Sequence, residues 1–137
     1  MTRQEIYRDM EATLGLAPSF FKAVPDSTLE QDWTAFKNIQ LAEGVVPNKY
    51  KELVGLGIAA ATKCHYCTLF HTSVAKMLGA TDEEIHEVLR YAGNSALWSL
   101  WLNGNQVDYD EFKDELRRIG EFLAAKAETA EPTKAAI

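Results

Sequence analysis

The chain has 137 residues, of which 47% are hydrophobic and 25% are charged, and its formal net charge is −6. This length and composition suit one folded domain with an ordinary core and argue against a disordered chain. The acidic balance argues against binding dominated by nucleic-acid phosphates or anionic lipids, because both need a basic surface. We therefore expect neither nucleic acid nor a membrane as a partner.

The N-terminal segment does not resemble a signal peptide, because residues 1–10 carry charged side chains and no apolar run. The longest nearly apolar run, residues 54–61, is far too short to span a bilayer. These two features predict a cytoplasmic protein. In that reducing compartment, closely spaced cysteines are more often catalytic or metal-binding than a structural disulfide.

Helical spacing of apolar residues begins at the N-terminus. Thr2 and Glu5 form a capping-box pattern, and the helix that follows is expected to end at Gly15. Ser27 and Glu30 have the same spacing and predict the start of a second helix. The buried side of this second helix should comprise Leu29, Trp33 and Phe36.

The middle of the chain is its most apolar part. Gly44 and Pro47 separate it from the preceding helix, and Pro47 can occupy the first helical position. Apolar positions are so frequent over residues 54–61 that we expect this helix to be buried nearly all round. Gly55 and Gly57 lack side chains and would allow a neighbouring helix to approach closely.

Further boundary signals follow toward the C-terminus. Gly79 is a natural residue just past a helix end, Thr81 and Glu84 form a third capping-box pattern, and Asp108 should precede the last helix. No stretch alternates as a strand would. The sequence predicts an all-α fold: a single-domain bundle of about six helices over residues 1–126, with a frayed tail over residues 127–137.

The most informative segment contains the only two cysteines of the chain, Cys64 and Cys67, followed by His71. These three residues follow the i, i+3, i+7 spacing, so on a helix they share one side. If that helix begins near Thr62, Cys64 lies in its first turn, where free N–H groups and the helix dipole favour a thiolate. Two sulfurs on one helix face can exchange between dithiol and disulfide, and the imidazole can accept a proton. Because no strand precedes the pair, the context is not that of a thioredoxin.

Other interpretations of the pair remain open. Two cysteines on an alanine-rich helix can simply be small buried side chains. Cys64, Cys67 and His71, with His65 or Glu52, could also supply four zinc ligands. We expect no metal. Structural zinc sites usually lie on loops in domains whose hydrophobic core is small, whereas this domain has enough apolar residues to form a core without metal. The aromatic residues Trp98 and Trp101 are expected in the core or at a subunit interface.

A set of short segments between Pro47 and about Leu89 forms a family pattern: Lys51-Glu52-Leu53, the alanines 59–61, Cys64-His65-Tyr66-Cys67, His71, Leu78-Gly79-Ala80 and Asp82-Glu83-Glu84-Ile85. With these residues, the stretch resembles the carboxymuconolactone decarboxylase-like family, specifically its alkylhydroperoxidase D-type branch. Decarboxylases of this family do not depend on a cysteine pair, so the pair favours the redox branch.

The resemblance implies an alkylhydroperoxidase D-like helical fold and homo-oligomers, trimers or hexamers, built by helix packing between subunits. It also implies thiol-dependent reduction of hydroperoxides without a cofactor, with a lipoyl or thioredoxin-like protein as the dithiol reductant. Glu52, Cys64, Cys67 and His71 would form the redox centre and its proton relay. The best-known members have a histidine where this chain has Tyr66, and tyrosine, with a pKa of about 10, is a poor base at neutral pH. Tyr66 could still orient a water or donate a hydrogen bond in support of the site.

The chemistry expected from these residues is a dithiol–disulfide cycle. We take Cys67 as the sulfur that attacks the peroxide and Cys64 as the one that resolves the sulfenic acid, and the reverse assignment stays open. His71 would take the proton from Cys67, and Glu52 would hold the imidazole or a bridging water. The alternative is a non-catalytic helical oligomer that uses the pair as a redox sensor or serves as a scaffold.

Overall fold

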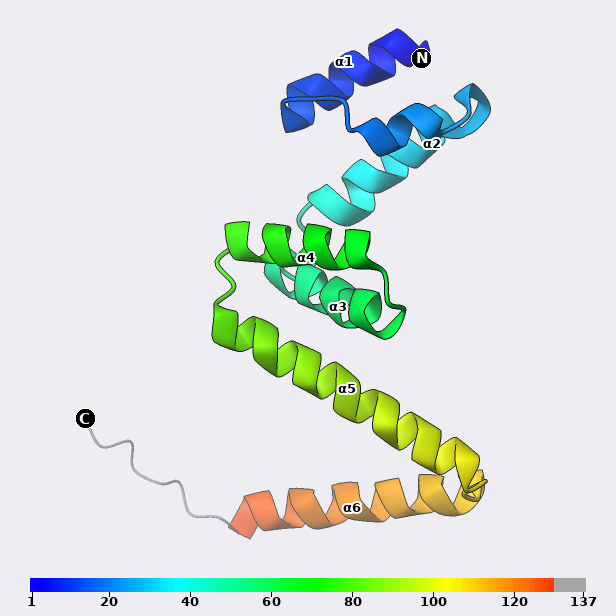
Figure 1. Ribbon diagram of the computed structural model, residues 1–137. Coiled ribbons are helices and arrows are strands. Elements are labelled where there is room, and N and C mark those ends of the chain that lie inside the picture. The colour runs from blue at the N-terminus through cyan, green and yellow to red at the C-terminus, as the bar shows by residue number, and fades with distance from the viewer. Residues whose placement is uncertain (130–137) are drawn as a thin grey trace, which may run out of the picture. The chain divides into compact units, whose positions relative to one another are not determined.

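The computed structural model describes residues 1–129. Helices account for every regular element of this part, so the all-α prediction is confirmed (Figure 1). The elements in chain order are α1 (Arg3–Leu14), the 3-10 turn η1 (Ser19–Ala23), α2 (Asp26–Phe36), the π-helical turn η2 (Lys37–Leu41), α3 (Asn48–Ala61), α4 (His65–Met77), α5 (Asp82–Gly104) and α6 (Tyr109–Thr129). Residues 127–129 of the expected tail are helical, and the rest of that tail lies outside the described residues.

The chain forms two compact units whose boundary falls inside α5. The first comprises Met1–Gly93, and the second begins at Asn94. The limits of a single domain at residues 1–126 stay a prediction. None of the helices among residues 1–129 combines the length and the apolar character needed to cross a membrane.

Two of the three predicted capping boxes are confirmed. The Thr2 hydroxyl accepts from the amide of Glu5, whose carboxylate accepts from the amide of Thr2 at 2.7 Å. Thr81 and Glu84 make the same reciprocal pair at 2.9 and 3.1 Å before α5. Each pair satisfies amides that a helix leaves free at its start.

The capping box predicted at Ser27 is wrong. α2 begins at Asp26, two residues earlier than a cap at Ser27 would place it, because Pro25 supplies the extended conformation of an N-cap with φ −60° and ψ 148°. Ser27 therefore lies within the first turn. The Glu30 carboxylate pairs with the N-terminal amino group of Met1 instead.

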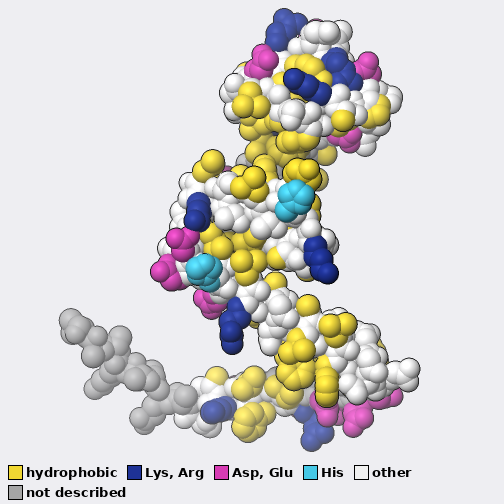
Figure 2. Space-filling view, in the orientation of Figure 1, with side chains coloured by type: hydrophobic (Ala, Val, Ile, Leu, Met, Phe, Trp, Pro, Cys, Tyr) yellow, Lys and Arg dark blue, Asp and Glu magenta, His cyan; other side chains and the backbone are white. Residues whose placement is uncertain are grey.

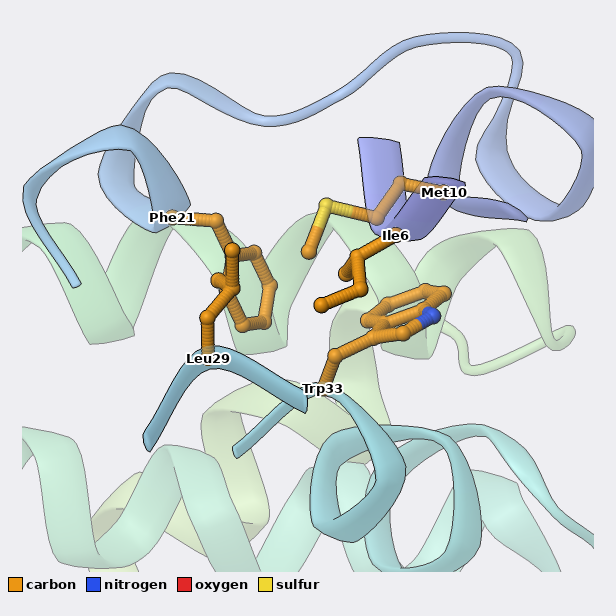
Figure 3. Close-up of a cluster of buried hydrophobic side chains, with 5 residues drawn as sticks. All are labelled: Ile6, Met10, Phe21, Leu29 and Trp33. Atoms are coloured by element: carbon orange, nitrogen blue, oxygen red, sulfur yellow. The ribbon is translucent and has the colours of Figure 1, made fainter. Parts of the chain in front are cut away.

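The first unit contains a core formed by α1, η1 and α2. Phe21 packs edge-to-face on Trp33 with ring centroids 5.6 Å apart, and the Trp33 indole donates to Asp9 at 2.6 Å. The indole is thus buried without leaving its N–H unpaired. Figure 3 shows the five side chains of this cluster pointing toward one another: Ile6, Met10, Phe21, Leu29 and Trp33.

The second core of this unit joins α3, α4 and the start of α5. Its buried residues are Leu53, Leu56, Ala75, Ala80 and Ile85. The prediction that residues 54–61 are buried nearly all round is wrong for the single chain. Val54 and Ile58 are 62% and 61% exposed, because α4 and α5 cover only one side of α3.

The second unit consists of the end of α5 and α6. Asp108 caps α6 as predicted, accepting from the amide of Glu111 at 2.8 Å. No residue of Tyr109–Thr129 is buried, and Trp98 and Trp101 of α5 are 53% and 61% exposed. Hydrophobic side chains accordingly lie on the surface of this part of the chain (Figure 2).

Candidate redox site

The turn between α3 and α4 places the first cysteine. α3 closes with the amide of Lys63 bonded to the carbonyl of Ala60 and the amide of Cys64 bonded to that of Ala59. Lys63 adopts the left-handed conformation, with φ 57°, that such a helix ending requires. The expected helix start near Thr62 is therefore wrong: α4 begins at His65, and Cys64 is its N-cap.

The two thiols lie against each other at the start of α4. Their Sγ atoms are 2.9 Å apart, and the Cys64 sulfur also accepts from the amide of Cys67 at 3.4 Å. Cys64 thus occupies the place that serine or aspartate often takes at a helix start. Since a disulfide bond is about 2.05 Å long, a small rotation of the side chains brings the sulfurs to bonding distance once an oxidant removes two electrons from the pair.

The hydrogen bonds make the two cysteines chemically unequal. The pKa of the Cys64 thiol lies below its ordinary value, because its sulfur is hydrogen-bonded to the Cys67 side chain and to the backbone N–H groups of Cys67 and Tyr66. The pKa of the Cys67 thiol is raised by the hydrogen bond to Cys64, by desolvation and by the charge on Cys64. These directions favour Cys64 over Cys67 as the thiolate of the pair.

The buried carboxylate of Glu52 lies beside the imidazole of His71. Glu52 of α3 is 1% exposed, and its Oε2 is 2.8 Å from Nδ1 of His71 of α4. A carboxylate only accepts hydrogen bonds, so Nδ1 must donate. This selects the tautomer in which Nε2 of the imidazole is free to accept a proton. The expectation that Glu52 holds this imidazole agrees with the contact.

The close approach of α4 to α3 depends on Gly55. A Cβ atom at this position would lie 2.4 Å from Cε1 and 2.6 Å from Nδ1 of His71, so the imidazole covers the glycine. A Cβ at Gly57 would meet only the Cβ of Ala92, at 3.6 Å, an ordinary contact. The glycine spacing predicted close approach of a neighbouring helix, and the imidazole is what lies closest to Gly55.

Sequence reasoning missed one residue of the site, Gln40. It belongs to the π-helical turn η2, and its side-chain amide donates to Oε1 of Glu52. Glu52 therefore has one partner on each oxygen. Gln40 lies 12 residues before Glu52, outside any helical repeat, so no periodic signal marked it.

The remaining candidate residues lie apart from this arrangement. Tyr66 is 76% exposed, and its ring lies against that of His65 with centroids 4.1 Å apart. Among residues 1–129, no hydrogen bond joins His71 to either sulfur. His71 follows Cys67 by one helical turn, a spacing that brings side chains near each other without requiring contact. The supporting role of Tyr66 stays a prediction.

The zinc ligand set considered from the sequence is not assembled. Within the described part of the chain, no group of three or more His, Cys, Asp or Glu side chains is arranged to hold a metal ion. The cysteine pair and the Glu52–His71 pair instead form two neighbouring hydrogen-bonded units on the α3–α4 hairpin.

A hollow of about 520 Å³ opens at the junction of α3 and α4. It is lined by Ala60, Lys63, His65, Thr68, Leu69 and Thr72. Thr68 connects this surface to the cysteine turn, because its hydroxyl donates to the carbonyl of Cys64 at 2.9 Å. The backbone of Cys64 is thus hydrogen-bonded to a residue that lines the hollow.

Comparison with known proteins gives consistent matches. The model of the carboxymuconolactone decarboxylase family matches residues 28–107, which include every residue of the site described above. An alkylhydroperoxidase AhpD core from Rhodospirillum rubrum, known from a crystal structure, superposes with a TM-score of 0.69 at 26% sequence identity. That match covers 79% of this chain and 82% of the other.

Two bacterial proteins without an assigned function are also similar. One, from Paracoccus denitrificans, is described as uncharacterized protein 4 in the cox locus and is 24% identical over 81 residues, or 59% of this chain and 73% of its own. The other, an uncharacterized protein of Cupriavidus necator, is 39% identical over 59 residues, which are 41% of this chain and 52% of its own.

Proposed function

Because this chain belongs to the carboxymuconolactone decarboxylase family and has an alkylhydroperoxidase D-like fold, we propose that it is a thiol-dependent peroxidase for organic hydroperoxides. One observation carries the proposal: two sulfurs lie 2.9 Å apart, and one of them has a lowered pKa at a helix start. The half-buried His71, one turn further along α4 and bonded to the buried Glu52 of α3, supplies the base.

In the first step, the Cys64 thiolate attacks the terminal oxygen of the hydroperoxide. The S–O bond forms as the O–O bond breaks, giving a sulfenic acid on Cys64 and an alkoxide that takes a proton and leaves as the alcohol. Cys64 is favoured as the attacking sulfur because its pKa is lowered. This order reverses the one that the sequence favoured.

In the second step, Cys67 resolves the sulfenic acid. Its raised pKa means that it needs a base to become a thiolate. His71 takes that proton, directly or through a water, and Glu52 stabilises the imidazolium that results. Cys67 then attacks the sulfur of Cys64, the disulfide forms and water leaves, so one hydroperoxide and two thiols become one alcohol, one water and one disulfide.

An external dithiol restores the reduced pair by thiol–disulfide exchange. We propose a lipoyl or thioredoxin-like protein for this role and a cytoplasmic location, where such donors are reduced. The open hollow at the α3–α4 junction supports access to the cysteine turn from solvent.

We also propose that the protein works as a homo-oligomer, because the apolar side chains of α6 have no cover within their own helix pair.

Titration of free thiols tests the peroxidase. Reduced, metal-free protein is exposed to one equivalent of an organic hydroperoxide, and we expect both thiols to disappear within seconds and to return with a dithiol. Two thiols still free after minutes would refute the proposal. One slow oxidation that changes the assembly, without repeated turnover, would point to the redox-sensor alternative.

Trapping of the sulfenic acid with dimedone tests the order of the cysteines. The label should appear in Cys67→Ser, which keeps Cys64, and not in Cys64→Ser. The opposite pattern would restore Cys67 as the attacking sulfur without affecting the peroxidase proposal itself.

A further inference from the structure

The π-helical turn η2 gives the end of α2 an unusual pattern of exposure. The amide of Ala42 bonds to the carbonyl of Lys37 at 2.9 Å, five residues back, so this turn is wider than an α-helical one. Ile39 is 70% exposed on it, whereas the neighbouring Gln40 is half-buried and bonds to Glu52. Burial of apolar area alone would favour the reverse arrangement. A single π turn is uncommon and frequently marks a functional site.

The partner of Gln40 explains this arrangement. Glu52 is 1% exposed, and a buried carboxylate is costly unless both of its oxygens are paired. Gln40 occupies Oε1 and His71 occupies Oε2. The amide of Gln40 must present its nitrogen here, because an amide oxygen would repel the carboxylate.

These contacts fix the carboxylate in two directions. A carboxylate held only by His71 could rotate about its side-chain torsions and carry the imidazole with it. With Gln40 on the other oxygen, the plane of the carboxylate is set, and Gly55 leaves the space in which the imidazole then lies. The position of Nε2, the nitrogen left free to accept a proton, follows from these constraints.

We infer that Gln40 is a positioning residue of the proton relay: it orients Glu52 so that Glu52 holds His71 with Nε2 available to Cys67. The inference rests on the proposed function, and nothing in the sequence pattern or in the family resemblance assigned this residue. Gln40 does not touch the sulfurs, and its effect passes through Glu52.

The test compares Gln40→Met with Asn38→Leu. Methionine keeps the length of glutamine and removes the donor, and Asn38 is an exposed amide in the same turn. A general base contributes about 100- to 10,000-fold to a rate, and we expect its misplacement in Gln40→Met to slow disulfide formation about tenfold. Asn38→Leu should stay within about twofold of wild type, since surface changes have small effects. Equal rates in all three proteins would overturn the inference.

The pH profile separates positioning from a merely structural role. In Gln40→Glu, the new carboxyl can donate to Glu52 only while it is protonated, so its rate relative to wild type should fall as the pH rises through the titration of that group. A deficit that is constant at every pH would contradict the inference. The pH profile of Gln40→Glu also tests the role of Gln40 if Gln40→Met does not fold.

Imidazole NMR tests the inference without relying on peroxidase activity. The chain has three histidines, so selective ¹⁵N labelling gives few signals, and His65→Gln and His86→Gln identify the signal of His71. Wild type and Asn38→Leu should show His71 protonated at Nδ1, and Gln40→Met should show a mixture of the two neutral tautomers. An unchanged tautomer in Gln40→Met would refute the role of Gln40 even if the peroxidase is real. The expected change in a protein that leaves hydroperoxides intact would refute only the proposed function.

Discussion

Residues 1–93 and residues 94–129 use their apolar side chains in opposite ways. The first region buries them in two clusters, and polar groups buried beside them are hydrogen-bonded. The Trp33 indole bonds to Asp9, and the Glu52 carboxylate bonds to His71. The second region has a helix with a clear apolar side and no buried residue. An apolar pattern therefore identifies the side of a helix that needs cover, but it does not say which molecule provides that cover.

The polar side of α6 supports this contrast. Arg117 pairs with Asp114 at 2.7 Å and with Glu121 at 2.6 Å, and these charges lie on the side of the helix away from its apolar residues. The apolar residues at helical spacing are Phe112, Leu116, Ile119 and Leu123. Such a side is typical of a helix that packs on another surface, and we proposed above that a second copy of the chain supplies it.

The largest effect is expected from replacing a buried tryptophan. Trp33→Ala removes an indole that is 2% exposed and should lower the free energy of unfolding by about 3–5 kcal/mol. Trp101→Ala, at a residue 61% exposed, should cost less than about 1 kcal/mol in dilute protein. Urea unfolding at two protein concentrations measures both. Equal losses in dilute protein would show that the second region is buried within one chain.

The apolar side of α6 should control assembly. Leu116→Glu combined with Leu123→Glu places two charges on it and should shift the protein to monomers in sedimentation velocity, with residues 1–93 still folded. Arg118→Glu changes the net charge by the same amount at an exposed residue and serves as the control. An unchanged sedimentation coefficient in the double variant would contradict a role of α6 in self-association.

The two glycines of α3 offer a matched comparison inside the first region. Gly55→Ala would place a Cβ 2.4 Å from His71 and should cost about 1–3 kcal/mol of stability and slow disulfide formation. Gly57→Ala meets only an ordinary contact and should be neutral or slightly stabilising, because alanine favours a helix. Thermal unfolding and stopped-flow oxidation measure the two effects. A Gly55→Ala protein that oxidises at the wild-type rate would show that the imidazole can move without consequence.

The smallest effect concerns pH. Because the pKa of the Cys64 thiol is lowered in the folded protein, the unfolded chain binds more protons in the range between the two pKa values. This contribution to stability is present above the ordinary cysteine pKa of about 8.5 and is lost as the pH falls through the lowered value.

The same lowered pKa should make Cys64 the more reactive thiol. Limited alkylation with iodoacetamide near neutral pH, followed by peptide mapping, should label Cys64 before Cys67. The reverse order of labelling would contradict the assignment of the thiolate.

Local sequence signals predicted most of the helical framework. The capping boxes at Thr2 and Thr81 and the helix ending at Gly15, with φ 82°, depend on residues within a few positions of one another. The prediction at Ser27 was wrong because Pro25, only two residues away, is the N-cap of α2 instead. The cysteines were correctly expected to be close, although the helix starts one residue after Cys64 and not before it.

The sequence by itself determined the all-α class and the residues that could carry redox chemistry, because periodicity and capping act over short stretches of chain. Only the tertiary structure decided which groups meet. The Gln40–Glu52 contact depends on a π turn, the fit of His71 over Gly55 depends on how closely two helices pack, and the preference for a Cys64 thiolate depends on the direction of backbone amides. These are properties of orientation in three dimensions, and residue spacing along one helix carries no information about them.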